Sequence, residues 1–284
     1  MRRLLADSGS TKTDWVVISQ NISPSVEPAT YSGRGLNPHI LSVEEIEDEM
    51  DRVALHLGRN FDEIRFYGAG VGNPQMVGKI SDCLANVFEC SDVVADSDMA
   101  GAARAVLGAR PGIACIMGTG SNSCHYNGSV IDRKSVSLGY ILDDCGGGVA
   151  FGRRLLSDVF KGIAPDAVAD EFFSCYRLTP PQVVDRLYSQ PGANKWIAGF
   201  MPFIVSHISD PYISAMVGDV LETFLEREFC CYPEWQLREE GIGFVGSVAF
   251  LLGDHLRDAL GRRGWMLRDI VRRPLDRLMT DNYN

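Results

Sequence analysis

The sequence predicts an α/β protein that is divided into two halves of mixed β-sheet. Each half opens with two short apolar strands joined by a turn of small residues, at 3–19 and again at 112–131. Strands that alternate with amphipathic helical segments follow, and this alternation is typical of sheets covered by helices. The Ala-Arg-Pro-Gly segment at 109–112 separates the halves, because Pro and Gly interrupt regular structure. We therefore expect one domain over residues 1–109 and a second over 110–284, whose last residues could pack back on the first.

The first half contains a clear helix start. Ser42 and Glu45 form a capping-box pattern, in which each side chain binds the backbone N–H of the other residue. Apolar residues then recur at helical spacing over 46–57, which predicts one buried helix face. The other elements predicted in this half are strands at 3–6, 14–19, 64–70 and 92–98, a turn at 7–13, and helices at 76–88 and 99–108.

The second half repeats the strand–turn–strand opening and then becomes mainly helical over 149–229. Prolines at 165, 180, 181 and 191 should interrupt this stretch, because proline lacks the N–H that a helix interior needs. The last elements predicted are a strand at 241–247 that enters a glycine turn, a helix at 248–260 and a strand at 264–271.

The charge of the chain limits its partners. The 284 residues carry a formal net charge of −10. Nucleic acids and anionic membranes select basic patches, so neither is expected as a partner. A small anionic ligand remains compatible, since local backbone N–H groups can hold it. No run of about 18 apolar residues occurs, so no membrane-spanning helix is expected.

The cysteines indicate a reducing compartment. Eight are present, and no two form a Cys-x-x-Cys pair. We expect them to be reduced, which predicts a cytoplasmic protein. Zinc and iron–sulfur sites are not expected, because the cysteine spacing suits neither. The apolar run before Asp7 covers only residues 4–6, which is too short for the core of a signal peptide.

The turn DSGSTKTD at 7–14 permits two interpretations. It could be an ordinary hairpin turn, because Gly, Ser, Asp and Thr favour tight turns. It could instead cradle phosphates, with small residues that let backbone N–H groups approach and with Lys12 adding a positive charge. Asp7 could then hold hydrated Mg²⁺, which prefers carboxylate and phosphate oxygens. Neither a Walker A loop nor a Rossmann fingerprint is present.

The second turn, GTGSNS at 118–123, has the same small-residue chemistry. Two such turns, one at the start of each half, could grip a polyphosphate from both sides. This repetition favours the phosphate hypothesis over two unrelated hairpin turns.

Asp98 is the candidate catalytic carboxylate. It lies where a predicted strand meets a predicted helix, so it could serve only as a helix N-cap. It could alternatively take the proton from an attacking hydroxyl as a general base. Asp96, two residues earlier, is the weaker candidate for this role.

Two later segments have a structural and a functional interpretation. Gly246-Ser247 could be a tight strand-to-helix connection, or a place where the backbone lies flat against a planar ring such as adenine. The glycine-rich segment at 139–156 could be a flexible loop, or a loop whose Asp144 accepts hydrogen bonds from the hydroxyls of a ligand.

Taken in this order, the motifs resemble those of the acetate-kinase/hexokinase/actin/Hsp70 superfamily. Within it, the chain is most similar to the eukaryote-type N-acetylglucosamine kinases and the related BadF/BadG/BcrA/BcrD-type ATPase family, over nearly its full length. The resemblance implies two ribonuclease H-like (actin-like ATPase) domains with a nucleotide cleft between them. It also implies ATP and Mg²⁺ as cofactors.

The resemblance assigns roles to individual residues. Asp7 would lie beside Mg²⁺, and Asp98 would be the catalytic base. Gly246 and Ser247 match the adenosine motif. The residues that would face the phosphates are Gly9, Ser10, Thr11, Lys12, Thr119, Gly120 and Ser121. Those that would contact the sugar are Asn37, Asn122 and Asp144.

One loop departs from the family pattern. Where the family has the sequence Gly-Asp-Glu-Gly-Ser, this chain has Cys145 in place of Glu and Gly147 in place of Ser. A thiol is a poor acceptor for sugar hydroxyls, and glycine offers no side chain. The acceptor could therefore differ from N-acetylglucosamine.

The resemblance leads to a sugar kinase as the expected function, with a small-molecule amino sugar as substrate and a possible homodimer as the assembly. An ATPase that activates a partner enzyme, as the benzoyl-CoA reductase activators do, is the alternative. A non-catalytic sensor of sugar or nucleotide is the third hypothesis.

Overall fold

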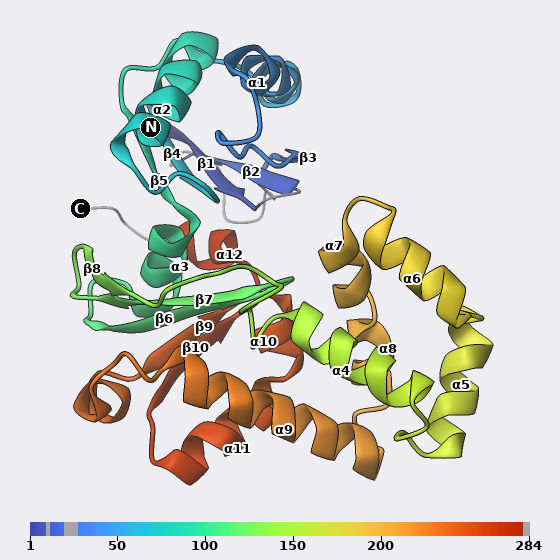
Figure 1. Ribbon diagram of the computed structural model, residues 1–284. Helices are drawn as coiled ribbons and strands as arrows, with labels where there is room; N and C mark the ends of the chain where they lie inside the picture. The colour runs from blue at the N-terminus through green and yellow to red at the C-terminus, as the bar shows by residue number, and fades with distance from the viewer. Residues whose placement is uncertain (10–11, 20–27, 281–284) are drawn as a thin grey trace. The chain divides into compact units, whose positions relative to one another are not determined.

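The computed structural model describes residues 1–9, 12–19 and 28–280, and the chain within it divides into two compact units. Unit 1 comprises Met1–Ala109 together with the segment that begins at Arg273, and unit 2 comprises Arg110–Arg272 (Figure 1). Ser10 and Thr11, two of the predicted phosphate ligands, lie outside the described residues.

Unit 1 is built on a five-stranded sheet with the order β3-β2-β1-β4-β5. The first three strands pair in antiparallel fashion, and β1, β4 and β5 run parallel. The strands are β1 Arg2–Ser8, β2 Lys12–Ser19, β3 Thr30–Arg34, β4 Glu63–Gly68 and β5 Val93–Ser97. The helices of this unit are α1 Val43–Leu57, α2 Pro74–Phe88, α3 Asp98–Leu107 and α12 Pro274–Leu278.

The sequence pattern explains how helices cover both faces of this sheet. Leu4 and Ala6 alternate along β1 and share a buried cluster with the apolar faces of α1 and α2. The predicted capping box at Ser42 and Glu45 is present at the start of α1. On the other face, α3 and α12 pack against each other and against β1 (Figure 1). Asp7 lies on this second face, because strand side chains alternate between the two sides.

Unit 2 is built on a second five-stranded sheet, with the order β10-β9-β6-β7-β8. Its strands are β6 Gly112–Met117, β7 Ser121–Tyr126, β8 Ile131–Lys134, β9 Ile242–Val245 and β10 Leu267–Val271. Its α-helices are α4 Gly148–Phe160, α5 Asp166–Tyr176, α6 Pro180–Tyr188, α7 Ala193–Ala198, α8 Met201–Ser206, α9 Pro211–Glu228, α10 Ser247–Leu251 and α11 Gly253–Arg263, with a π-helical turn η1 at Gln236–Glu240.

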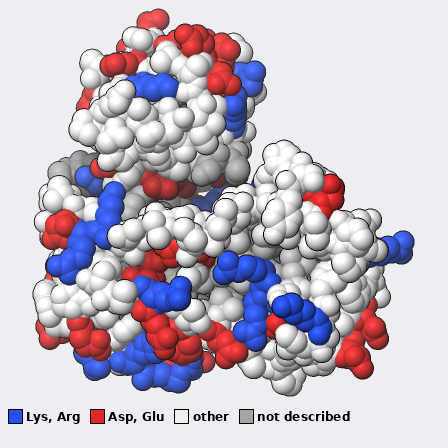
Figure 2. All heavy atoms as spheres, viewed as in Figure 1, with Lys and Arg blue, Asp and Glu red and all other residues white. Residues whose placement is uncertain are grey.

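Helices α4 and α9 contribute much of the core that covers this second sheet. Their apolar sides meet the buried residues of β6 and β9, whereas their polar sides face outward. Figure 2 shows Lys and Arg side chains gathered over the surface where Figure 1 draws these two helices.

The α/β class with two mixed sheets is confirmed, but two predicted elements need correction. The first strand was expected to end before Asp7, but β1 continues to Ser8 because its residues pair in register with β2. The predicted helix at 248–260 is broken at Leu252, which separates α10 from α11. The strands β3 and β8 were not predicted. Among the described residues, no helix is both long and apolar enough to cross a membrane.

Candidate functional site

Asp7 lies in an acidic environment near the end of β1. In the sheet register it is opposite Asp14 on β2 and beside Tyr67 on β4. Burial and then the negative charges of Asp98 and Asp14 raise the pKa of Asp7 from its ordinary value of 3.8 to about 7, and Lys12 opposes this shift. The carboxylate is therefore held where a cation would be stabilised, since a positive ion removes the repulsion.

Asp98 is the first residue of α3, directly after β5. The helix N-cap is Ser97, whose Oγ accepts a hydrogen bond from Ala100 N. The structural interpretation of Asp98 as the N-cap is therefore wrong. Asp98 Oδ1 accepts from the N–H of the next residue, Met99, at 2.9 Å. Asp96, the weaker candidate, accepts in the same way from Ser97 N.

Lys12 is held by a carboxylate that the sequence analysis did not single out. Lys12 Nζ lies 2.7 Å from Asp14 Oδ1, and the Ser32 hydroxyl on β3 donates to the same oxygen. Asp7, Asp14 and Ser32 occupy matching register positions on three adjacent strands. The cation predicted to meet phosphates is thus anchored beside the acid predicted to meet Mg²⁺.

Asn37 is brought toward the same end of the sheet by the segment that follows β3. Ser8 Oγ accepts from Leu36 N at 3.0 Å and forms a hydrogen bond with Thr13 Oγ1 at 2.8 Å. Asn37 Oδ1 accepts from His39 N at 3.0 Å, which fixes its side chain. Unit 1 therefore collects Asp7, Lys12, Asn37 and Asp98 around the ends of β1, β4 and β5.

The residues of unit 1 suit a magnesium ion that arrives with a nucleotide. Among the described residues, no group of three or more His, Cys, Asp and Glu side chains is placed to hold a metal by itself. Mg²⁺ commonly binds through one or two carboxylates and completes its shell with water and phosphate oxygens. Asp7, whose charge is destabilised by burial and then by neighbouring acids, provides a donor of this kind.

In unit 2, the turn between β6 and β7 is held by the first residues of α4 and by the loop that precedes them. Gly148 N donates to Gly118 O at 2.8 Å, and Val149 N donates to Thr119 O at 3.1 Å. Asp144 Oδ1 accepts from Ser121 N at 2.9 Å. The predicted phosphate turn and the predicted sugar loop therefore form one hydrogen-bonded assembly.

The backbone of this loop explains one departure from the family pattern. A Cβ added at Gly147 would lie 2.4 Å from Gly120 Cα, a distance that requires the turn to shift. Serine therefore does not fit at this position in the observed arrangement. Asp144 itself adopts a left-handed conformation with φ of 59°, which is uncommon for a residue other than glycine. Burial is the main cause that raises the pKa of Asp144.

Gly246 brings the predicted adenosine motif to the same turn. It has a φ of 125°, and a Cβ there would lie 2.2 Å from Met117 O at the end of β6. Only glycine permits this close approach, which leaves Ser247 to begin α10. Unit 2 therefore collects Thr119, Gly120 and Ser121 with Gly246 and Ser247.

A buried polar cluster behind β7 was missed by the sequence analysis. Ser123 Oγ donates to Glu228 Oε1 at 2.6 Å and lies 2.9 Å from the Tyr232 hydroxyl. Burial is the main cause that raises the pKa of Glu228. Asn122, the predicted sugar contact, precedes Ser123 and accepts from its backbone N–H at 2.8 Å. Sequence separation hid this cluster, since Ser123 and Glu228 come from distant parts of unit 2.

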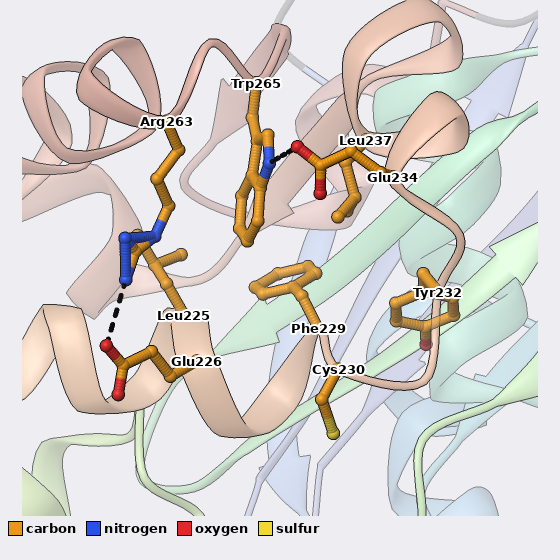
Figure 3. Close-up of a pocket in the computed structure, with 9 residues that line it drawn as sticks. All are labelled: Leu225, Glu226, Phe229, Cys230, Tyr232, Glu234, Leu237, Arg263 and Trp265. Atoms are coloured by element: carbon orange, nitrogen blue, oxygen red, sulfur yellow. Dashed lines mark hydrogen bonds and ion pairs between the residues drawn. The ribbon is translucent and has the colours of Figure 1, made fainter.

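A hollow of about 600 Å³ lies elsewhere in unit 2, near the first residues of β9 and β10. Figure 3 shows Trp265 and Phe229 on its walls, with Glu234 bound to the indole Nε1 at 3.0 Å and Glu226 3.6 Å from Arg263. Each of its charged groups already has an ion-pair partner, since Arg263 pairs with Glu226 and Glu222, and Glu234 pairs with Arg238. Gly246 follows the opposite end of β9, so this hollow is separate from the predicted adenosine motif.

No protein-family model matches the chain, and no curated protein matches it. Among solved structures, the chain is similar to a Porphyromonas gingivalis protein described as a candidate N-acetylglucosamine kinase. The two share 33% identity over 98% of this chain and 97% of that one, with a TM-score of 0.89.

Two more distant structures share the fold. One is a Chromobacterium violaceum protein, also described as a candidate N-acetylglucosamine kinase, with 17% identity, 94% coverage of each chain and a TM-score of 0.69. The other is a ROK family glucokinase from Streptomyces griseus, solved with glucose and AMPPNP. It shows 16% identity over 98% of this chain and 97% of that one, with a TM-score of 0.55.

Proposed function

The chain belongs to the family of the N-acetylglucosamine kinases, and we propose that it transfers the γ-phosphoryl group of ATP to a hydroxyl of an amino sugar. The observation that carries this proposal is that α3, which begins at Asp98, packs on β1, on the side of the sheet that bears Asp7, so that the charge of Asp98 acts on that carboxyl. A general base must lie near the phosphates that its substrate attacks, and Asp7 is the residue expected beside their metal ion.

The two units would supply different parts of the chemistry. In unit 2, the backbone of Thr119, Gly120 and Ser121 would bind phosphate oxygens, while Gly246 and Ser247 would lie against the adenosine. In unit 1, Gly9, Ser10, Thr11 and Lys12 would bind the phosphates. Support for this division comes from the close packing of Gly246 against Met117 O, since the segment proposed to meet the adenosine and the turn proposed to bind phosphates are then neighbours.

We propose that Asp98 accepts the proton of the attacking hydroxyl and that Asn37, Asn122 and Asp144 hold the sugar. Asp7 would hold Mg²⁺, which supplies positive charge to the transferring phosphoryl group. Lys12 would add a second positive charge to the same oxygens. Most of the rate enhancement would then come from positioning and electrostatic stabilisation, as is usual for phosphoryl transfer.

ADP formation by the purified protein tests this proposal. Mg²⁺ and ATP are supplied with N-acetylglucosamine, N-acetylmannosamine or glucose, and the sugar phosphate is identified by mass. We expect ADP formation that depends on an amino sugar. ADP formed at the same rate without sugar would favour the activator hypothesis instead, and ATP binding without any turnover would favour a sensor.

We further propose a cytoplasmic location and a homodimer. All eight cysteines are free, as expected in a reducing compartment. The homodimer is proposed from the family resemblance. Light scattering of the purified protein would give twice the 31.2 kDa mass of the chain for a dimer.

A further inference from the structure

Residues 35–42, between β3 and α1, carry Asn37, the proposed sugar contact, and contain neither helix nor strand. Within this Asn37 segment, Asn37 O accepts from Ile40 N at 3.0 Å and from Leu41 N at 3.1 Å. The remaining polar backbone groups of a partly buried segment need partners outside it. Those partners form two anchors, one on each side of Asn37.

The first anchor is a pair of fully buried hydroxyls, Ser8 on β1 and Thr13 on β2, which are directly opposite in register. Thr13 Oγ1 donates to Arg34 O at 2.8 Å. Since a hydroxyl has a single hydrogen, Ser8 must be the donor in the 2.8 Å bond between the two hydroxyls. Ser8 Oγ in turn accepts from Leu36 N at 3.0 Å. These bonds form one directed chain that holds the backbone at residues 34 and 36.

The second anchor is the ammonium group of Lys79 on α2. Lys79 Nζ donates to Pro38 O at 3.0 Å and to Leu41 O at 2.6 Å. Hydrogen bonds from a charged donor are stronger than those between neutral groups. The first anchor holds residues 34 and 36 and the second holds residues 38 and 41, so Asn37 lies between them.

The turn after β4 restricts the side chain of Asn37. Gly70 in this turn has a φ of 84°, and a Cβ there would lie 2.4 Å from Asn37 Oδ1. The same turn is bonded to the first anchor, because Ser8 O accepts from Ala69 N at 2.8 Å. Ser8 therefore holds the Asn37 segment with its hydroxyl and the neighbouring turn with its backbone.

The anchoring hydroxyls are next in sequence to the residues proposed for the nucleotide. Ser8 follows Asp7, and Thr13 follows Lys12. Consecutive side chains of a strand lie on opposite faces of the sheet. The ends of β1 and β2 therefore present Asp7 and Lys12 on one face and the hydroxyl pair on the other.

We propose that Ser8, Thr13 and Lys79 are positioning residues that hold Asn37 in the geometry the sugar requires, and that they set the affinity for the sugar rather than for ATP. The inference rests on the proposed kinase function and adds residues that no sequence motif pointed to. Ser8 and Thr13 are too deeply buried to touch a sugar, so they act through Asn37. A contact that is already ordered loses less conformational freedom when the ligand binds.

Thr13→Val separates the hydrogen bonds from the packing, because valine has the shape of threonine without its hydroxyl. We expect KM for the sugar to rise about 10-fold, the value of one hydrogen bond, while KM for ATP changes less than about 2-fold. Thr13→Ser retains the hydroxyl and should keep KM for the sugar close to that of the natural protein. A lower apparent kcat with both KM values unchanged is the result of lost stability alone, and it would overturn the proposal. An equal rise in the two variants would also overturn it.

Lys79→Met tests the second anchor, since methionine keeps most of the side-chain length and loses the donor. KM for the sugar should again rise about 10-fold. Lys79→Arg keeps a charged donor and should raise it less. The control is Lys161→Met, at an exposed lysine that follows α4, and both of its KM values should stay unchanged. A sugar KM for Lys79→Met equal to that of the control would remove Lys79 from the role.

A double-mutant cycle shows whether the first anchor acts through Asn37. Asn37→Ala removes the contact that the anchor positions, so the addition of Thr13→Val should raise KM for the sugar by less than about 2-fold more. A full 10-fold rise in the Asn37→Ala background would mean that Thr13 acts by another route, and the proposal would fail.

The acceptor in these assays is whichever of N-acetylglucosamine, N-acetylmannosamine and glucose gives the natural protein its highest kcat/KM. Unchanged sugar KM values in the Thr13 and Lys79 variants would overturn the positioning role and leave the kinase function intact. If the natural protein phosphorylates none of the three, the kinase function fails. Calorimetric titration with N-acetylglucosamine then decides the positioning role: a Kd about 10-fold higher in Thr13→Val supports it, and equal binding or no binding overturns it.

Discussion

Asp7 and Asp14 lie directly opposite each other on β1 and β2, and the charge of Asp14 adds to the burial and to the charge of Asp98 that raise the pKa of Asp7. Two acids directly opposite each other on neighbouring strands repel each other, and a bound cation relieves this repulsion. This pair therefore links the stability of unit 1 to pH and to metal binding.

The pH dependence of unfolding should change in Asp7→Asn. Because the pKa of Asp7 is raised from 3.8 to about 7, the folded protein binds more protons than the unfolded chain between these values. The free energy of unfolding attributable to Asp7 should thus fall as the pH rises from about 4 to 7. Each pKa unit corresponds to about 1.4 kcal/mol, so a shift of about three units sets an upper limit of ~4 kcal/mol.

Urea unfolding in buffer free of metal and nucleotide measures this effect. The variant should be more stable than the natural protein at pH 8, and the difference should shrink toward pH 4. A difference that does not vary with pH would contradict the assignment. Mg²⁺ should raise the midpoint of the natural protein at pH 8 more than that of the variant.

Phosphoryl transfer should depend on Asp98. In Asp98→Asn the side chain keeps its shape but loses its basicity, so turnover should fall roughly 10²- to 10⁴-fold. Equilibrium binding of ATP should be retained, as measured with a fluorescent ATP analogue. The control is Asp96→Asn, which should keep most of its activity. If the loss occurs in the Asp96 variant instead, the base has been assigned to the wrong carboxylate.

Asp14 should affect the binding of ATP indirectly, by positioning Lys12, because the two side chains are 2.7 Å apart. We expect Asp14→Asn and Lys12→Met each to raise the KM for ATP at pH 8, where Asp7 is ionised. The double variant should resemble Lys12→Met alone, with a coupling energy of about 0.5–3 kcal/mol. Additive effects would mean that Asp14 acts by another route. Asp92→Asn, which removes the 3.0 Å partner of Arg65 in the same sheet, is the control.

Gly147→Ser should lower stability although it restores the family residue. Serine would favour the helix start, because Gly147 is the N-cap of α4. Its Cβ would nevertheless lie 2.4 Å from Gly120 Cα, and overpacking of this kind costs about 1–3 kcal/mol. Calorimetry should show a Tm lower by roughly 2–6 °C.

The control for this variant is Gly218→Ser in α9, where an added Cβ meets no atom within 4 Å. Its Tm should stay close to that of the natural protein. A Tm for Gly147→Ser equal to that of the control would show that the turn at Gly120 can shift without a loss of stability.

The sequence predicts the elements of the fold well wherever a local pattern determines them. The capping box at Ser42 and Glu45 and the prolines at or just before the starts of α5, α6 and α7 mark helix boundaries through backbone chemistry that acts over a few residues. The edge strand β3 escaped prediction because its exposed residues give only a weak pattern of alternating burial.

The candidate site likewise combines residues that a local pattern points to with residues that only the fold brings together. Small residues in the two turns and an acid after a strand were enough to predict, from local sequence alone, two phosphate-binding turns and Asp98 as the base. The roles of Asp14 and Glu228 could not be predicted in this way. Asp14 gains its importance from strand register, and Glu228 meets Ser123 only after more than a hundred intervening residues have folded.

The discontinuity of unit 1 affects how the protein can be synthesised. The chain leaves this unit after Ala109 and returns to it at Arg273, where α12 contributes the buried side chains of Leu275 and Leu278. The ribosome synthesises the first 109 residues well before α12. The face of α3 that packs against α12 therefore stays uncovered while unit 2 is translated. Nascent chains interrupted before residue 273 should accordingly be prone to aggregation or chaperone capture, even when every strand of the unit 1 sheet has already emerged.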